Sequence, residues 1–246
     1  MYYITGDTHG DFSRIEYFCE KKHPNRDDDV LIILGDAGFN YYGGRRDDRA
    51  KQYMAEMPIT IFSIHGNHEM RPAAIPSYHT DLWKGGKVYL EDEYPNLLFG
   101  MDGEIYNFEG LQTVVMGGAY SVDKYYRLAM GWNWWPDEQP DAEIKARVER
   151  NLAARNWNVD IVLSHTTPLK YEPVEVFLPG IDQSRVDKST ETWLDDIENR
   201  LTYRHWYAGH YHTEKDIDRL TLLFESIRVF GEANPNEECT GMAQGT

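Results

Sequence analysis

Short apolar runs alternate with amphipathic segments in the first quarter of the chain. Residues 1–5, 30–34 and 58–64 are almost wholly apolar, which is typical of strands that are buried on both faces. Over 11–22 and 46–57, apolar positions recur with the period of a helix that has one buried face. The alternation of strand and helix predicts parallel pairing and a layered α/β core.

The pattern changes in the middle of the chain. Residues 85–118 hold the short segments KVYL, NLLF, EIYNF and LQTVVM, separated by Gly, Asn and Asp, and this predicts a β-meander. The polar stretch 233–246 contains Gly and Pro and is typical of a poorly ordered tail, so we expect one domain over 1–232. The remaining pattern predicts two helices, over 137–155 and 189–201, and four strands, over 160–163, 204–208, 220–224 and 227–230.

Length and composition fit a globular protein of one or at most two domains. Of the 246 residues, 41% are hydrophobic, which is enough for a sizeable core. No run approaches the roughly 20 apolar residues of a membrane helix, and the first residues do not have the pattern of a signal peptide. Cys19 and Cys239 are far apart in the sequence and do not indicate a disulfide framework. We therefore expect a cytoplasmic protein without a membrane partner.

A formal net charge of −16 narrows the range of partners. Such a surface repels the phosphate backbone of DNA and RNA, so we do not expect tight nucleic-acid binding. A phosphorylated small molecule or a phosphoprotein is compatible with this charge, because two bound divalent cations would make one cleft locally positive. The sequence does not indicate an oligomeric state.

Residues that can bind metal ions follow five of the apolar runs. The blocks GDTHGD, GDAG, GNHE, SHTTP and GHYH supply, in this order, Asp7, His9, Asp36, Asn67, His68, His165, His210 and His212. In open α/β sheets, sites gather beyond the carboxyl ends of the strands, so five such ends can converge on one place. Independent turns would also use Asp, Asn and Gly, but they would not require histidines in the same register.

The side chains in these blocks favour particular metals. Residues two apart on an extended segment point to one side, so Asp7 and His9 can face one ion, and His210 and His212 can face the same cleft. Carboxylate, imidazole and amide ligands suit Mn, Fe, Zn, Mg or Co, of which we favour Mn. The number of ligands indicates two ions, with Asp36 able to bridge them. Two ions roughly 3.5–4 Å apart stabilise an in-line displacement at phosphorus and lower the pKa of a bridging water.

The five blocks, written D-x-H, G-D, G-N-H-[DE], H and G-H-x-H, together resemble the calcineurin-like metallophosphoesterase superfamily. They span residues 7–212, and GGAYSVDKYYR at 117–127 is similar to a block in bacterial and phage members. The resemblance implies a four-layer α/β/β/α sandwich with a dinuclear metal site at the strand ends. It also implies a hydrolase that cleaves a phosphate ester by in-line attack of a hydroxide bridging the two metals.

The resemblance assigns a role to each motif residue. It implies that His68 is catalytic and assists the departing oxygen, whereas a hydrogen bond to a ligand is the alternative role for this residue. It implies two ligand sets: Asp7, His9, Asp36 and His212 for the first metal, and Asp36, Asn67, His165 and His210 for the second.

The chain departs from the protein-phosphatase branch of that superfamily. That branch carries G-D-x-x-D-R-G in the second block, whereas this chain has Phe39 in place of the acidic partner of His68 and lacks the following arginine. His65 stands where that branch has another arginine. We therefore expect a phosphomonoesterase. The alternatives are a nucleotide-type phosphodiesterase, a phosphoprotein phosphatase and, from a different class, a non-catalytic metal-binding scaffold.

Residues between the motifs set the substrate. Segment 166–190 follows His165 and is rich in turn residues, so it is a candidate lid over the cleft. Trp132, Trp134 and Trp135 either line a pocket or pack within the protein. Five basic side chains are candidate phosphate contacts: Arg45, Arg46, Arg71, Lys124 and Arg127.

Overall fold

The three N-terminal apolar runs form adjacent parallel strands. A computed structural model describes residues 1–232, in which Tyr3 pairs with Leu31, and Leu31 with Ile61. Their nearly continuous apolar character is explained by burial on both faces of the sheet. The predicted strand–helix alternation is confirmed by β1 (Tyr2–Thr5), α1 (Ser13–Lys22), β2 (Val30–Ile33), α2 (Arg45–Ala55) and β3 (Thr60–Ser63).

Two mixed sheets contain the strands of the described chain. The first sheet has the order β13-β1-β2-β3-β6-β5-β4, and the second has the order β11-β12-β10-β9-β8-β7. The further strands of the first sheet are β4 (His79–Trp83), β5 (Gly86–Leu90), β6 (Leu97–Gly100) and β13 (Arg228–Val229). The second sheet consists of β7 (Ile105–Phe108), β8 (Leu111–Met116), β9 (Ile161–Ser164), β10 (His205–Ala208), β11 (Lys215–Ile217) and β12 (Leu220–Leu222).

The predicted β-meander over 85–118 is confirmed for the antiparallel pairs β5–β6 and β7–β8 but is wrong between β6 and β7. Its four segments are strands β5 to β8, but β5 and β6 belong to the first sheet and β7 and β8 to the second. The chain changes sheets at a turn around Gly103, which has φ +82°. A Cβ there would lie 2.9 Å from Cα of Val148, so the turn passes tightly against the following helical layer.

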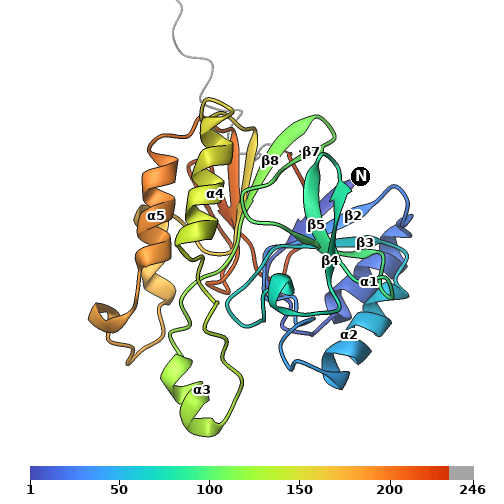
Figure 1. The fold of residues 1–246 in the computed structure, drawn as a ribbon, viewed down its shortest axis with the longest axis horizontal. Coiled ribbons are helices and arrows are strands. Elements are labelled where there is room, and N and C mark those ends of the chain that lie inside the picture. Colours follow the sequence, from blue (N-terminus) through green and yellow to red (C-terminus); the bar gives the residue numbers. More distant parts are fainter. Residues whose placement is uncertain (233–246) are drawn as a thin grey trace, which may run out of the picture.

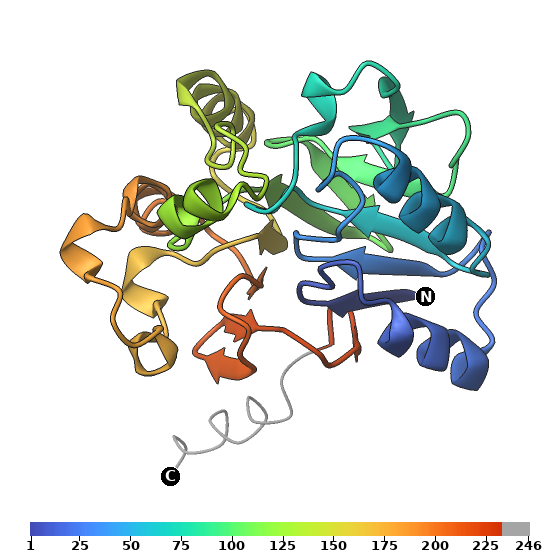
Figure 2. The same ribbon diagram turned by 90° about the horizontal axis from the view of Figure 1, so that it is seen from below.

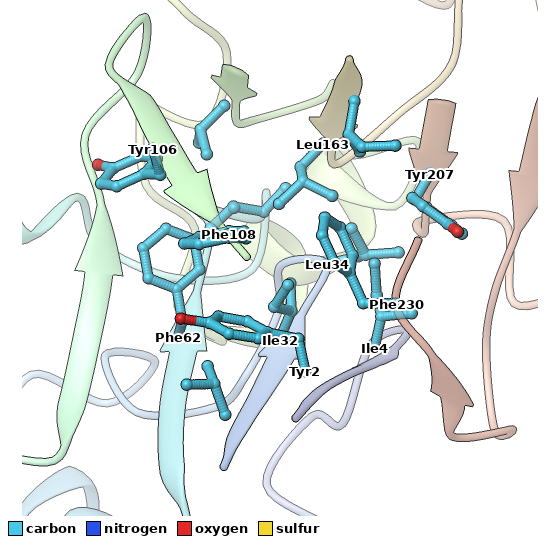
Figure 3. Packing of buried hydrophobic residues seen from close by; sticks show 14 of the residues in the cluster. Tyr2, Ile4, Ile32, Leu34, Phe62, Tyr106, Phe108, Leu163, Tyr207 and Phe230 are labelled. Atoms are coloured by element: carbon cyan, nitrogen blue, oxygen red, sulfur yellow. The ribbon is translucent and has the colours of Figure 1, made fainter. Parts of the chain in front are cut away.

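A hydrophobic core fills the space between the two sheets (Figure 3). Tyr2 and Ile4 of β1 point into it, whereas Tyr3 packs on the opposite face of the same strand. Aromatic rings join the sheets, with 5.0 Å between the ring centroids of Tyr2 and Phe108. The alternation along β1 therefore attaches one sheet both to the other sheet and to the helices outside it.

Helices cover the outer face of each sheet. Helices α1 and α2 lie against the first sheet, and α4 (Ala142–Ala153) and α5 (Ser189–Glu198) lie against the second (Figures 1 and 2). The predicted four-layer α/β/β/α sandwich is confirmed. Helix α4 begins later than predicted, because the side chain of Asp141 caps it by accepting a hydrogen bond from the backbone N–H of Ile144 at 2.8 Å.

Three elements were not predicted. Strand β4 is an edge strand with mostly exposed side chains, and β11 has only three residues. Helix α3 (Lys124–Met130) projects away from both sheets (Figure 1). Segment 166–190 contains the 3-10 turns η2 (Leu169–Tyr171), η3 (Val174–Val176) and η4 (Gln183–Arg185).

Within residues 1–232, no helix has both the length and the apolar character needed to cross a membrane. The predicted tail, residues 233–246, lies outside the described residues, so the domain boundary stays a prediction.

Candidate active site

The five motif blocks meet beyond the carboxyl ends of five strands. Strands β1, β2 and β3 are neighbours in the first sheet, and β9 and β10 are neighbours in the second, so the loops that follow them lie at one edge of the sandwich. Possible ligand atoms lie within 4.8 Å of one another in three groups: Asp7, His9 and His212; His9, Asp36 and His68; and Asp7, Asp36 and His165. The structure therefore brings together motif residues that are far apart in the sequence.

Asp7 presents a free oxygen to two imidazoles. Its Oδ1 accepts a hydrogen bond from the backbone N–H of His210 at 2.9 Å, whereas its buried Oδ2 has no hydrogen-bond partner. Oδ2 lies 3.7 Å from Nε2 of His9 and 3.5 Å from Nε2 of His212. The two Nε2 atoms are 2.8 Å apart. This set of one carboxylate and two imidazoles suits a divalent cation.

A second pair of groups meets between the two sheets. The ring of His165 donates its Nδ1 proton to the carbonyl oxygen of Leu34 at 2.7 Å, which leaves Nε2 as the ring nitrogen that faces the motif residues. This Nε2 lies 2.8 Å from Oδ1 of Asn67. The amide of Asn67 is oriented by a hydrogen bond from Nδ2 to Oγ of Ser121 at 2.8 Å. An imidazole nitrogen and an amide oxygen that face each other in a buried position can together ligate one divalent cation.

Asp36 lies between these two groups. Its Oδ1 accepts a hydrogen bond from the backbone N–H of His68 at 2.7 Å, and its Oδ2 is 3.6 Å from Nε2 of His165. The loop after β3 comes so close that a Cβ on Gly66 would lie 2.0 Å from Oδ1 of Asp36. Only glycine allows this approach.

The expectation that Asp7 and His9 share an extended segment is wrong. The backbone is left-handed at His9, with φ 48°, and also at His210 and His212, with φ 67° and 49°. Asp36 has φ 49° as well. Non-glycine residues rarely adopt this region, and such strain is found mainly at functional sites. The side chains converge because the loops turn sharply.

Electrostatic interactions in the site favour a neutral His210 and ionised Asp7 and Asp36, whereas hydrogen bonding to Asp7 raises the pKa of His212. Burial, together with the charge of His165, lowers the pKa of His210 to about 3, so its imidazole is neutral at physiological pH. Burial raises the pKa of Asp7, but the interactions with His165 and His212 outweigh it and hold the pKa below its usual value. The same balance of burial and neighbouring histidines lowers the pKa of Asp36. Neutral imidazoles and ionised carboxylates bind divalent ions.

His68 has partners that the motif analysis missed. Nη2 of Arg127 donates to Nδ1 of His68 at 2.5 Å, and Nε of Arg127 donates to Oδ2 of Asp123 at 2.7 Å. Oδ1 of Asp123 lies 3.8 Å from Nε2 of His68. Phe39, which stands in place of the family's usual acidic partner, is buried and stacks on Phe12 with 5.5 Å between the ring centroids. Asp123 is therefore the carboxylate that lies near His68.

The other four basic candidates have different contacts and are not bonded to His68 in the described chain. Arg71 is buried and bonded to the carboxylate of Asp102. Arg46 lies over the ring of Tyr42, and Arg45 lines a separate surface hollow. Nζ of Lys124 is 3.9 Å from the ring centroid of Trp134. Of the five predicted phosphate contacts, Arg127 alone is bonded to a motif residue in the described chain.

A cavity of about 380 Å³ opens beside the motif residues. One wall contains His9, Asp36, Asn67, His68, His210 and His212. Segment 166–190 also lines the cavity, with residues that include Val176, Phe177, Leu178 and Ile181. Trp132, Trp134 and Trp135 do not line it. Segment 166–190 is therefore placed where a lid would lie, while closure of the segment stays a prediction.

Comparison with known protein families agrees with the resemblance that the five motif blocks indicated. A family model described as calcineurin-like phosphoesterase matches residues 2–214. None of the curated proteins compared with the chain matches it significantly.

Solved structures resemble this fold at low sequence identity. TT1561 of Thermus thermophilus is 12% identical over 91% of this chain and 87% of that one, with a TM-score of 0.49. The phosphopantetheinyl hydrolase of Mycobacterium tuberculosis is 15% identical over 91% of this chain and 87% of that one, with a TM-score of 0.48. A putative 5'-nucleotidase of Staphylococcus aureus is 14% identical over 91% of this chain and 48% of that one, with a TM-score of 0.45. At this level of similarity, the names of these proteins do not indicate the substrate of this one.

The family model covers most of the chain, and residues that could hold a metal ion lie together beside one cavity. The chain belongs to the calcineurin-like phosphoesterase family and is a metallophosphoesterase.

Proposed function

We propose that this enzyme hydrolyses a phosphomonoester at a centre of two divalent metal ions, with manganese as the favoured metal. The observation that carries the proposal is the convergence of three possible ligands, because Nε2 of His165 lies 2.8 Å from Oδ1 of Asn67 and 3.6 Å from Oδ2 of Asp36. The buried Oδ2 of Asp7, which has no hydrogen-bond partner, also supports a bound cation.

The side chains fit two ligand sets that share Asp36. We assign Asp7, His9, Asp36 and His212 to one ion, and Asp36, Asn67, His165 and His210 to the other. When bound, such ions attract the phosphate oxygens and lower the pKa of the water that attacks phosphorus in line. The hydrogen bonds from His165 to Leu34 and from Asn67 to Ser121 hold two of the ligands in orientation.

We assign His68 to the departing oxygen and not to a metal. Its Nδ1 accepts the hydrogen bond from Arg127, which leaves the proton of the neutral ring on Nε2. Burial lowers the pKa of this imidazole, so the neutral form is favoured. His68 lines the cavity, where its Nε2–H can donate a hydrogen bond to the oxygen that leaves phosphorus. The positive charge of Arg127 beside the ring also argues against a bound cation at that position.

The size and position of the cavity favour a small molecule over a phosphoprotein. A volume of about 380 Å³ lies within the range of small-ligand sites, roughly 300–1,000 Å³. Segment 166–190 contributes Val176, Phe177, Leu178 and Ile181 to the lining, so part of the cavity is covered by a segment of this chain. The cytoplasmic location expected from the sequence stays a prediction.

Two model esters test this function. Purified protein with added Mn²⁺ is given p-nitrophenyl phosphate, a monoester, and bis-p-nitrophenyl phosphate, a diester. We expect faster turnover of the monoester by the native enzyme and loss of turnover in Asp36→Asn. Asp196→Asn makes the same change on an exposed face of α5 and serves as the matched control.

Each outcome is informative. Preference for the diester would replace the monoesterase assignment by a phosphodiesterase. Absence of turnover in protein that holds two metal equivalents would contradict the proposed general phosphoesterase activity. Retained turnover in folded Asp36→Asn would contradict the assignment of the bridging ligand.

A further inference from the structure

The part of the cavity beyond the metal-binding residues has an unusual combination of side chains. Its apolar surface comes from Val122, Val176, Leu178, Ile181 and Val186. Three carboxylates also line the cavity, from Asp123, Glu172 and Glu191. Among the lining residues in the described chain, none is Lys or Arg. This wall is therefore suited to a group that is partly apolar and carries no negative charge of its own.

Two of the three carboxylates have cationic partners. Glu172 accepts from Nζ of Lys188 at 2.6 Å, and Asp123 accepts from Nε of Arg127 at 2.7 Å. Glu191 differs, because no Lys or Arg of the described chain forms an ion pair with it. Its Oε1 accepts a hydrogen bond from Oγ1 of Thr166 at 2.9 Å, whereas its Oε2 has no hydrogen-bond partner.

Glu191 is strongly buried for a carboxyl group. It lies in the first turn of α5 and is only 4% exposed, at the wall of the cavity. Burial raises its pKa to about 7, so the ionised carboxylate is costly here unless a donor lies beside it. A buried acceptor without a partner is destabilising, and a ligand that donates a hydrogen bond to it removes that cost.

We propose that Glu191 binds a hydrogen-bond donor on the alcohol part of the substrate. The substrate class is then a phosphate monoester of a small, partly apolar alcohol that ends in an ammonium or hydroxyl group and bears no second phosphate. The carbon skeleton lies against the apolar wall formed by residues 176–186, and the phosphate lies at the motif residues. This inference rests on the proposed monoesterase function and names the substrate class for the same site.

A matched series of alkyl phosphates tests the inference. The probes have the same chain of four to six carbons and end in methyl, hydroxyl, ammonium or a second phosphate. We expect kcat/KM to be at least about tenfold higher for the hydroxyl or ammonium probe than for the methyl probe, because a donor pairs the buried acceptor. We expect the bisphosphate to be the poorest substrate of the series.

The variant Glu191→Gln provides the structural test. Its amide oxygen can accept the hydrogen bond from Thr166, which turns the amide N–H₂ toward the place of the unpartnered oxygen. An acceptor is thereby replaced by a donor of nearly the same shape. We expect the preference for the donor-tipped probe over the methyl probe to fall at least about tenfold. The control Asp196→Asn, on the exposed face of the same helix, keeps the preference of the native enzyme.

The outcomes separate this inference from the proposed function. If neither p-nitrophenyl phosphate nor any probe is hydrolysed, the monoesterase function itself fails. If the methyl probe and p-nitrophenyl phosphate are hydrolysed but the terminal group has no effect, the role of Glu191 alone is overturned. The role is also overturned if folded Glu191→Gln retains the native preference. A comparison of the ammonium and hydroxyl probes identifies which donor the site selects.

Discussion

At the scale of single residues, Gly66 sets the geometry of the metal-binding centre. A Cβ at this position would lie 2.0 Å from Oδ1 and 2.2 Å from the backbone nitrogen of Asp36. Gly66→Ala must therefore displace a carboxylate that both proposed ligand sets share. A displacement of about 1 Å in an active site can lower the rate by about 100-fold, and we expect a loss of this size in kcat/KM for p-nitrophenyl phosphate.

Gly44→Ala is the matched control for this substitution. A Cβ on Gly44 meets no atom within 4 Å, and its backbone is extended with φ 171°. This variant should retain native activity. Native activity in Gly66→Ala would show that the centre tolerates movement of Asp36 and would contradict the geometry described above.

Glu191 makes protein stability depend on pH. Burial raises its pKa from an ordinary 4.5 to about 7 in the folded state. The contribution of this group to stability is therefore complete below about pH 4.5 and is lost as the pH rises through 7. A difference of this size corresponds to about 3 kcal/mol of unfolding free energy.

Glu191→Gln removes this titration. We expect the unfolding free energy of the variant, relative to the native protein, to rise by about 3 kcal/mol between pH 4 and pH 8. Urea unfolding of the two metal-free proteins at several pH values measures the difference. The exposed control Asp196→Asn should show no comparable trend. A pH-independent difference for Glu191→Gln would mean that the carboxyl is not protonated in the folded state.

At the scale of elements, one buried ion pair attaches α2 to the residue that follows β5 of the first sheet. Nζ of Lys51 on α2 lies 2.5 Å from Oε2 of Glu91, which follows β5, and both side chains are buried. Removal of one partner leaves the other charge buried and unpaired. We expect Lys51→Met to lower the unfolding free energy by about 3–5 kcal/mol in urea denaturation.

The double variant Lys51→Met/Glu91→Met checks the cause of this loss. It leaves no unpaired charge, so it should recover most of the lost stability. A double variant as unstable as Lys51→Met would show that the helix is attached by packing and not by the ion pair.

Element prediction from the sequence succeeded where side-chain burial determines the pattern. Strands β1, β2, β3 and β9 are buried along their whole length or nearly so, and their apolar runs identify them. Strand β4 lies at a sheet edge with residues 79–82 exposed, so its sequence has no apolar run to detect. The division of β5 to β8 between two sheets depends on tertiary pairing, which the local pattern does not contain.

In the candidate site, the residues that stand in sequence motifs were predictable, whereas those placed by tertiary packing were not. Asp7, Asp36 and the histidines stand in motifs whose order is specific, and the structure brings them together. Asp123 lies in the 117–127 block but received no role there, and Glu191 stands in no motif. Both line the cavity because of how α3 and α5 meet it. Asp123 and Arg127 are four residues apart, a spacing that favours an ion pair on one helix but does not place the pair beside His68.

At the scale of the whole molecule, the site exists only where the two sheets meet. Asp7, Asp36 and Asn67 follow strands of the first sheet, whereas His165, His210 and His212 follow strands of the second. A bound ion would therefore connect the two halves of the sandwich. It would also place positive charge in a protein whose formal net charge is −16, which explains how an acidic chain can attract a phosphate ester.

The most direct test of this account is a metal titration of the enzyme. Metal-free protein receives Mn²⁺ in steps, while bound metal per chain and hydrolysis of p-nitrophenyl phosphate are measured on the same samples. We predict no hydrolysis without metal and a rise in activity that is complete when two ions are bound per chain. Full activity in the metal-free protein, or no activity with two ions bound, would contradict the account.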